Sequence, residues 1–291
     1  MLLGKLLVVG TTRNCGATLE KNVNRIVQAC KDFDEVSFYL VESDSEDNTR
    51  AVLSKLESEY ANFKYISMGK LEVLIPERVE RIRFCRNKYI EFLKERQNSP
   101  ERFDFVMVAD LDKVNSKLSR KSVVSCFANK LNWDACFANQ SFGYYDLYAL
   151  RAPGWVNHDI FKELRTAFSL INTTDAKWTN LVEYFQRDRL RKVHIYENMR
   201  RIPSHHSWIK VQSAFGGAAI YRADVLSSTD YSSINLNNET CEHVDLNMKL
   251  HKQGMNLFIN PQFINSNFNE YNLNRITLIR YLRALKSYIA R

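Results

Sequence analysis

Two aspartates separated by one residue, Asp110 and Asp112, are the side chains in this sequence best suited to chemistry. They follow five consecutive apolar residues, 105–109, a pattern typical of a buried strand that ends at a sheet edge. Because side chains alternate along extended chain, both carboxylates can point the same way. Two adjacent carboxylates repel each other unless a cation lies between them. Mg²⁺ or Mn²⁺ binds through one or two carboxylates and phosphate oxygens, so the pair predicts a metal-diphosphate site.

Taken alone, the tripeptide also fits an exposed loop pair or a helix cap. The surrounding pattern favours the metal site. Apolar runs alternate with amphipathic stretches, which predicts an α/β fold with a mostly parallel central sheet flanked by helices. The expected strands of the first half are residues 6–10, 36–41, 63–67 and 105–109. Ligands bind beyond the carboxyl ends of such strands, so the polar loops 11–16, 42–49 and 110–112 should share one edge.

The second half of the chain has a different pattern. Strands are expected at residues 133–138, 216–221 and 257–260, with Pro261 closing the last one. Residues 156–201 are charged and helical in pattern, and residues 245–254 predict a helix that stops at Gly254. No internal repeat or inter-domain linker stands out, so both halves are expected to belong to one domain.

Composition limits the class of protein. The 291 residues are 45 % hydrophobic and 25 % charged, values typical of a globular protein. The net charge of +8 permits anionic partners such as nucleotide phosphates or lipid, but the basic and aromatic residues form no nucleic-acid-binding pattern. Six scattered cysteines without a CxxC pair fit a reduced, cytoplasmic chain without structural zinc. No apolar run reaches the ~20 residues of a membrane span, and residues 1–10 fit a first strand better than a signal peptide.

These motifs occur in the order found in the nucleotide-sugar glycosyltransferases of the GT-A fold, which the chain resembles over roughly residues 5–262. The motifs are loop 11–16 before a helix, the acidic loop 42–49, Arg86-Asn87, Asp110-Leu111-Asp112, Gly216-Gly217 and segment 241–246. Residues 144–151, YYDLYALR, are similar to a segment of capsule-associated α-mannosyltransferase-type enzymes. The resemblance implies a nucleotide-sugar-binding half, 1–135, and an acceptor-binding and catalytic half, 136–262. The remaining residues, 263–291, are expected to form a C-terminal basic amphipathic helix.

The resemblance also implies which residues hold the donor. Asp110 and Asp112 would bind Mn²⁺ or Mg²⁺, which stabilises a leaving diphosphate as a Lewis acid. The expected contacts of a UDP- or GDP-linked sugar are Thr11, Arg13, Glu42, Asp44, Arg86, Asp110, Gly216 and Gly217. Other roles stay open for these residues: structural ion pairs for the arginines, a helix N-cap for the acidic loop and a tight turn for the glycines.

Glu242 and Asp245 are the candidates for catalysis, because an inverting transfer needs a carboxylate that takes the proton of the acceptor hydroxyl. Inverting members of the fold usually have Glu-Asp in this segment, whereas here His243 replaces the Asp. Glu242 is then the base, or both acids bind sugar hydroxyls, or the transfer is retaining and needs no such base. His243 is a candidate third metal ligand, with a structural histidine as the alternative.

Tyr144, Tyr145 and Asp146 are the expected acceptor-binding residues, because aromatic faces suit sugar rings and a carboxylate suits hydroxyls. Aromatic core packing is the alternative for the tyrosines. In the tail, Leu278, Leu282, Leu285 and Ile289 recur at helical spacing among basic residues. Such a helix can lie on an anionic membrane or pack on the domain. A cytoplasmic protein, peripheral on the cytoplasmic face of the inner membrane, is the expectation.

The leading hypothesis is a metal-dependent glycosyltransferase. It would move a sugar from a nucleotide-diphosphate donor to a hydroxyl of a glycan or lipid-linked acceptor in capsule or O-antigen-like polysaccharide synthesis. A sugar-nucleotide nucleotidyltransferase is the alternative enzyme, but loop 11–16 lacks the Gly-rich phosphate loop that such enzymes need. A non-catalytic sugar- or membrane-binding protein with the same fold is the third hypothesis, against which Asp110 and Asp112 argue.

Overall fold

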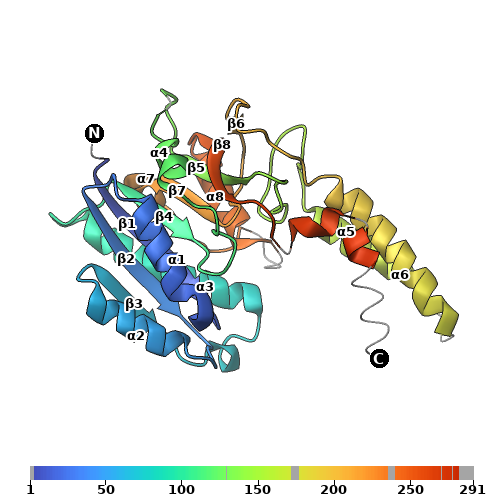
Figure 1. Cartoon of the computed structure of the whole chain (residues 1–291), viewed down its shortest axis with the longest axis horizontal. Helices are drawn as coiled ribbons and strands as arrows, with labels where there is room; N and C mark the ends of the chain where they lie inside the picture. Colours follow the sequence, from blue (N-terminus) through green and yellow to red (C-terminus); the bar gives the residue numbers. More distant parts are fainter. Residues whose placement is uncertain are drawn as a thin grey trace.

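One eight-stranded sheet forms the centre of the described structure, in the strand order β3-β2-β1-β4-β7-β5-β8-β6 (Figure 1). The structure is a computed structural model, and it describes residues 3–128, 130–171, 177–234, 240–269, 271–276 and 278–281. Helices cover both faces of the sheet, which confirms the α/β fold with a central sheet flanked by helices.

The first half of the chain forms the parallel part of the sheet. Its elements are β1 (Lys5–Thr12), α1 (Gly16–Ala29), β2 (Glu35–Glu42), α2 (Thr49–Glu59), β3 (Phe63–Ser67), η1 (Leu71–Val73), α3 (Arg78–Gln97) and β4 (Phe105–Ala109). β1 pairs in parallel with β2 and β4, and β2 pairs in parallel with β3. Parallel strands end at the same edge, so the polar loops that follow β1, β2 and β4 meet there.

The second half adds strands of mixed direction. Its elements up to the end of the sheet are α4 (Arg120–Val124), β5 (Ala135–Gln140), α5 (Ile160–Ser169), α6 (Lys177–Arg191), η2 (Lys192–Tyr196), β6 (Ile209–Lys210), β7 (Ala218–Arg222), α7 (Ala223–Ser227), α8 (Glu242–Lys252) and β8 (Leu257–Ser266). β7 lies between β4 and β5 and is antiparallel to both. β5 and β8 are parallel, and β6 is antiparallel to β8. Because β7 runs against β4, its first residue, Ala218, pairs with the last residue of β4, Ala109.

Alternating side chains of the strands fill two cores, one on each face of the sheet. In β1, Leu6 and Val8 pack with α1, α2 and α4, whereas Leu7 and Val9 pack with α3 and α8. All four side chains are fully buried. Burial of each such side chain contributes roughly 1.5–3 kcal/mol to stability, which explains why the sequence of β1 is a continuous apolar run.

Pro261 does not end the last strand, contrary to the prediction. β8 continues to Ser266, and its register with β5 shifts between Ile259 and Ile264. Proline cannot donate a ladder hydrogen bond, and an irregularity of this kind accommodates it. The side chain of Asn139 donates to the Pro261 carbonyl. Residues 263–266 therefore belong to the sheet, not to a C-terminal helix.

A helical projection extends from the sheet, made of α5, α6, η2 and η3 (Asn272–Arg275) (Figure 1). Arg280 and Asp188, each 6 % exposed, form a buried ion pair with a 2.6 Å Nε–Oδ1 distance. The rings of Tyr281 and Phe185 are also in contact. Residues 278–281 therefore pack on α6, while residues 282–291 of the predicted amphipathic helix lie outside the described residues. Within the described ranges, every helix is too short or too polar to cross a bilayer.

Candidate active site

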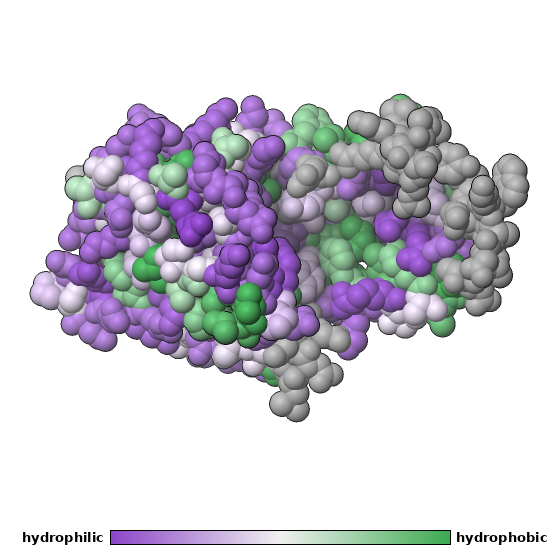
Figure 2. Space-filling model, turned by 90° about the horizontal axis from the view of Figure 1, so that it is seen from below, coloured by the Kyte–Doolittle hydropathy of each residue, from purple (hydrophilic) through white to green (hydrophobic). Residues whose placement is uncertain are grey.

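A cavity of about 690 Å³ lies at the carboxyl edge of the parallel strands and is lined by both halves of the chain. On the face shown in Figure 2, the molecule is hollowed between the body of the sheet and the projecting helices. The predicted residues that line the cavity are Thr11, Arg13, Asp44, Arg86, Asp110, Asp112, Tyr145, Asp146, Glu242 and His243. Glu42, Gly216, Gly217, Tyr144 and Asp245 do not line it.

Arg86 of α3 joins the two halves of the site. Its guanidinium is buried, with Nη2 3.6 Å from Asp110 Oδ1 and Nε 3.3 Å from Glu242 Oε1. Nη1 donates a 3.1 Å hydrogen bond to the hydroxyl of Tyr89. The rings of Phe215 and Tyr231 each lie 5.6 Å from the guanidinium carbon, a cation–π distance. Arg86 therefore holds a carboxylate of β4's loop and a carboxylate of α8 on the same cavity.

Asp110 is a carboxyl group whose pKa is raised by its surroundings. Burial raises the pKa of this carboxyl to about 8; Arg86 opposes the rise, and the acids Asp112, Asp146 and Glu242 add to it. Even so, 34 % of the side-chain surface remains accessible. Carboxylates that raise one another's pKa in this way are favourable ligands for an added cation, because the cation removes the repulsion.

The donor set fits a hard divalent cation that shares its shell with a phosphate. Asp112 is exposed, and its Oδ1 accepts the Val114 N–H at 2.9 Å. Across the described residues, no three His, Cys, Asp or Glu side chains gather at a possible metal site. Asp110, Asp112 and His243 therefore do not form a three-ligand centre. Two carboxylates are what Mg²⁺ or Mn²⁺ commonly takes from a protein when a substrate phosphate completes its shell.

His243 lies inside an aromatic and cationic environment. Its ring stacks on Phe215 with a centroid distance of 3.7 Å and meets Tyr231 edge-on. Burial, together with the charge of Arg86, lowers the pKa of His243 well below its usual value. Among the described residues, neither ring nitrogen has a hydrogen-bond partner. His243 is therefore a neutral imidazole at the cavity wall.

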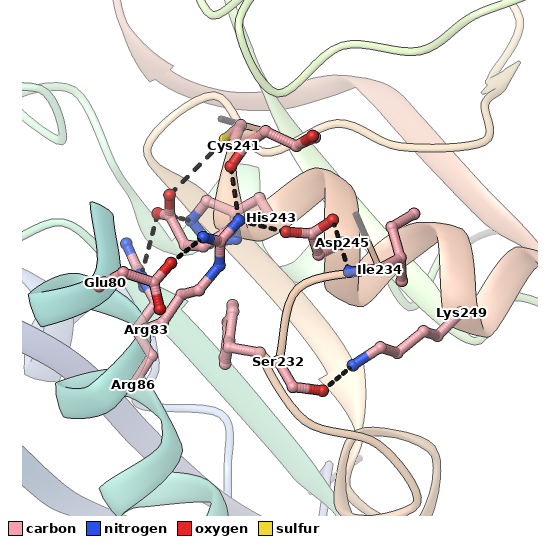
Figure 3. Close-up of polar contacts among 12 residues, drawn as sticks. Glu80, Arg83, Arg86, Ser232, Ile234, Cys241, His243, Asp245 and Lys249 are labelled. Atoms are coloured by element: carbon pink, nitrogen blue, oxygen red, sulfur yellow. Dashed lines mark hydrogen bonds and ion pairs between the residues drawn. The ribbon is translucent and has the colours of Figure 1, made fainter. Parts of the chain in front are cut away.

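Glu242 and Asp245 take different directions although both lie in the first turn of α8. Asp245 pairs with Arg83, which lies one turn before Arg86 on α3 (Figure 3). Glu242 instead faces Arg86. Asp245 is fully buried and also accepts the Ile234 N–H at 3.3 Å. The two helices are thus joined by two ion pairs, of which only Arg86–Glu242 borders the cavity. Asp245 therefore lies behind the cavity wall and links α8 to α3.

Gly216 and Gly217 do not line the cavity but contact residues that do. Both have positive φ, at 73° and 86°. The Gly217 carbonyl accepts the N–H of Asp110 at 3.0 Å, and a Cβ on Gly217 would lie 2.9 Å from the Tyr145 hydroxyl. The Gly216 N–H donates to Asp146 Oδ2 at 2.9 Å. The turn before β7 therefore needs both glycines, and through it β7 holds the backbone of Asp110.

The two neighbouring tyrosines differ in their surroundings. Tyr144 is fully buried, and its hydroxyl accepts the N–H of Phe215 at 3.2 Å, so it belongs to the core rather than to a ligand surface. Tyr145 lines the cavity and stacks on Tyr271, with centroids 5.1 Å apart. Asp146 lines the cavity too, but its carboxylate accepts backbone N–H groups of Gly216 and Ala149. Burial raises the pKa of Asp146.

The acidic loop after β2 is partly structural. Glu42 is buried and accepts the Ser45 N–H at 2.9 Å, so it fixes the loop rather than lining the cavity. Asp44 lines the cavity, with Oδ2 3.6 Å from Arg81 Nε. Arg13 forms an exposed 3.0 Å pair with Glu72.

Sequence patterns did not reveal several residues of the cavity. These are Thr12, Arg78, Arg81, Tyr148, Phe161, Arg165, Phe215 and Tyr271. Arg78 and Arg81 are spaced one helical turn apart, which could have suggested a shared face. The aromatic residues come from separate segments, and no local pattern connects them.

Residues 7–93 match the family model described as glycosyl transferase family 2. The match runs from β1 to α3 and includes Thr11, Asp44 and Arg86. A search of curated proteins gave no match.

Solved structures with a similar arrangement include the mannosyltransferase PcManGT from Pyrobaculum calidifontis in complex with GDP-Man and Mn²⁺. It is 12 % identical, with a TM-score of 0.47, over 90 % of this chain and 56 % of that chain. TarS 1-349 of S. aureus with UDP-GlcNAc is 11 % identical, with a TM-score of 0.46, over 91 % and 59 %. Glucosyl-3-phosphoglycerate synthase from Mycobacterium tuberculosis with UDP is 12 % identical, with a TM-score of 0.40, over 90 % and 69 %.

At these identities and TM-scores, the likeness to the three structures supports no assignment of substrate. The chain spans less than two thirds of the first two, 56 % and 59 % of their lengths. The family match over residues 7–93 and the helix-flanked sheet agree with the resemblance to GT-A glycosyltransferases that the motifs indicated.

Proposed function

We propose that the protein transfers a sugar from a UDP- or GDP-linked donor to a hydroxyl of a glycan or lipid-linked acceptor. Synthesis of a capsule or O-antigen-like polysaccharide is the process that this activity would serve. The observation that carries the proposal is the cavity lined by Asp110 and Asp112, in which Arg86 contacts both Asp110 and Glu242 of the other half. The glycosyl transferase family 2 match over residues 7–93 supports it.

The donor would occupy the part of the cavity formed by residues 1–135. Asp110 and Asp112 would hold Mn²⁺ or Mg²⁺, which when bound offsets the charge of the leaving diphosphate. Thr11, Arg13 and Asp44 line the same side and would contact the nucleotide. Arg86 keeps Asp110 in place and adds a buried positive charge near the diphosphate.

The acceptor would enter from the half formed by residues 136–262. Glu242 lines the cavity and is 7 % exposed, so its carboxylate can meet a substrate hydroxyl. In an inverting transfer, Glu242 would take the proton of that hydroxyl while Arg86 holds its carboxylate in position. Tyr145 would offer a ring face to the acceptor sugar.

Substitution of the two aspartates tests the proposal. Asp110→Ala and Asp112→Ala should each lower turnover at saturating donor by about 10²-fold or more, because the leaving diphosphate loses its counter-charge. Release of UDP or GDP from a panel of nucleotide sugars, with Mn²⁺ present, measures the effect. Glu46→Ala, an exposed acid of a neighbouring loop, is the matched control. Full activity of both aspartate variants would contradict the proposed metal site.

The raised pKa of Asp110 predicts in which direction the stability of the protein changes with pH. The folded protein keeps this proton up to about pH 8, whereas the unfolded chain loses it at roughly pH 4. The folded state therefore binds more protons across this window, and the stability of the metal-free protein should fall as pH rises through it. Asp110→Asn should flatten that fall, and Mn²⁺ affinity of the wild type should increase toward pH 8. Urea unfolding and Mn²⁺ titration at pH 5–9 measure both, and a slope equal in wild type and variant would refute the assignment.

Removing the carboxylate charge should affect turnover at Glu242 and stability at Asp245. Glu242→Gln should reduce kcat by about 10²–10⁴-fold, as expected for a general base, and should also lower stability because buried Arg86 loses one of its carboxylate partners. Asp245→Asn leaves the buried Arg83 without one of its carboxylates and should lower the free energy of unfolding by about 3 kcal/mol. Steady-state kinetics and urea unfolding distinguish the two. A Glu242→Gln effect confined to the KM of the acceptor would make Glu242 a binding residue.

We also propose peripheral contact with an anionic membrane, on the cytoplasmic face of the inner membrane, through the projecting helices. Leu278, Tyr281 and Phe185 are 66 %, 43 % and 47 % exposed, and Arg189 and Lys192 lie on the same projection. Apolar side chains among basic ones suit an anionic interface. Vesicles containing phosphatidylglycerol should therefore co-float with the protein more than phosphatidylcholine vesicles do. The double variant Leu278→Ser with Phe185→Ser should reduce this co-flotation. If the variant and the wild type partition equally, these residues serve only in packing.

A further inference from the structure

The cavity continues beyond Glu242 to a wall made by α5 and the segment before it. Tyr148, Phe161 and Arg165 line this wall. The rings of Tyr148 and Phe161 meet edge to face, with centroids 5.5 Å apart. Burial raises the pKa of Tyr148 to about 12; nearby acids, Glu242 among them, add to the rise, and the charge of Arg165 opposes it. Tyr148 thus lies within electrostatic reach of both Glu242 and Arg165.

Arg165 differs from the other arginines of the cavity. Arg13 pairs with Glu72, Arg81 donates to two backbone carbonyls, and Arg86 is held by Asp110 and Glu242. Arg165 is exposed and has no hydrogen bond or ion pair to any residue in the part of the chain that the structure describes. Arg78 also lacks such a partner there, but it lies at the start of α3, in the half that would hold the donor.

The acids that line the cavity come from the sheet edge and α8, whereas the lining residues of the α5 wall include no acid. The acids are Asp44, Asp110, Asp112, Asp146 and Glu242, with Arg13, Arg78, Arg81 and Arg86 among them, and the α5 wall carries Arg165. An anion on a sugar would therefore meet Arg165 at the α5 wall without a neighbouring acid of the lining. Guanidinium binds phosphate or carboxylate through two parallel hydrogen bonds, and ring faces beside it suit the apolar side of a sugar.

We propose that the acceptor is an anionic sugar, one bearing a phosphate or carboxylate group, and that Arg165 binds this group while the neighbouring hydroxyl points toward Glu242. This inference rests on the proposed function, because it names the acceptor class for the same cavity. Arg165 would act as a specificity-determining residue. The aromatic pair of Tyr148 and Phe161 would support the ring between the two charged ends.

Binding of simple sugars to the full chain tests the proposal without turnover. The probes are methyl β-D-glucoside, its carboxylate analogue methyl β-D-glucuronide, and glucose 6-phosphate. Each is titrated calorimetrically with Mn²⁺ and saturating UDP or GDP present, so that phosphate does not enter the donor side. We expect at least one anionic probe to bind about tenfold more tightly than the neutral glucoside. The two anionic probes distinguish a carboxylate-bearing from a phosphate-bearing acceptor.

The variants on α5 decide whether Arg165 is responsible. Arg165→Gln should remove the preference for the anion, Arg165→Lys should keep part of it, and Lys162→Gln should leave it unchanged. Lys162 is the matched control, because it is an exposed cation of the same helix that does not line the cavity. Equal affinity for neutral and anionic probes, or a preference that survives in Arg165→Gln, would overturn the inference.

The inference and the proposed function can fail separately. Loss of nucleotide release in Asp110→Ala, together with an unchanged anion preference in Arg165→Gln, would overturn the acceptor assignment and leave glycosyl transfer intact. An anion preference that depends on Arg165, together with full activity in Asp110→Ala, would support the anion site and reject the metal-dependent transfer. Thermal melting of each variant checks folding, and exposed Arg165 is expected to tolerate substitution.

Discussion

The buried guanidinium of Arg86 is the contact on which the arrangement of the site depends. Removing a charged group from water costs several kcal/mol, so Arg86 is stable in its position only because other groups offset this cost. Asp110, Glu242, the Tyr89 hydroxyl and two aromatic rings do so. The same contacts fix a carboxylate from each half of the chain on one cavity. Packing of α3 against α8 therefore also brings the residues of the site together.

The sheet topology supplies the second part of this arrangement. β7 runs antiparallel between β4 and β5, which places its glycine turn beside the loop that carries Asp110. The Gly217 carbonyl then holds the backbone of Asp110, and the Gly216 N–H holds Asp146. A third parallel neighbour at this place would begin at the opposite edge and could not provide these contacts. The change of strand direction in the second half thus serves the position of the acids.

The two sides of the cavity differ in charge: its acids come from the sheet edge and α8, whereas Arg165 of α5 has no hydrogen-bond or ion-pair partner among the described residues. Burial raises the pKa of Asp110 to about 8 and the neighbouring acids add to the rise, so the sheet edge favours a divalent cation and the phosphates that accompany it. The α5 wall with Arg165 favours an anion. Two substrates that enter from opposite ends would be oriented before any chemistry occurs, and such orientation lowers the barrier to a two-substrate reaction.

The sequence by itself determined the α/β class, the parallel first half and the polar loops at its carboxyl edge. Each depends on local information: apolar runs such as 105–109 that must be buried, and polar residues directly after them. It did not determine that Glu242 faces the cavity while Asp245 lies behind it, or that Tyr145 is exposed to the cavity and Tyr144 is core. These choices depend on how α8 packs on α3 and how the segment after β5 turns. Tyr148, Phe161 and Arg165 share a cavity with Glu242 only through the tertiary structure, because contacts between residues distant in sequence leave no periodic pattern in the chain.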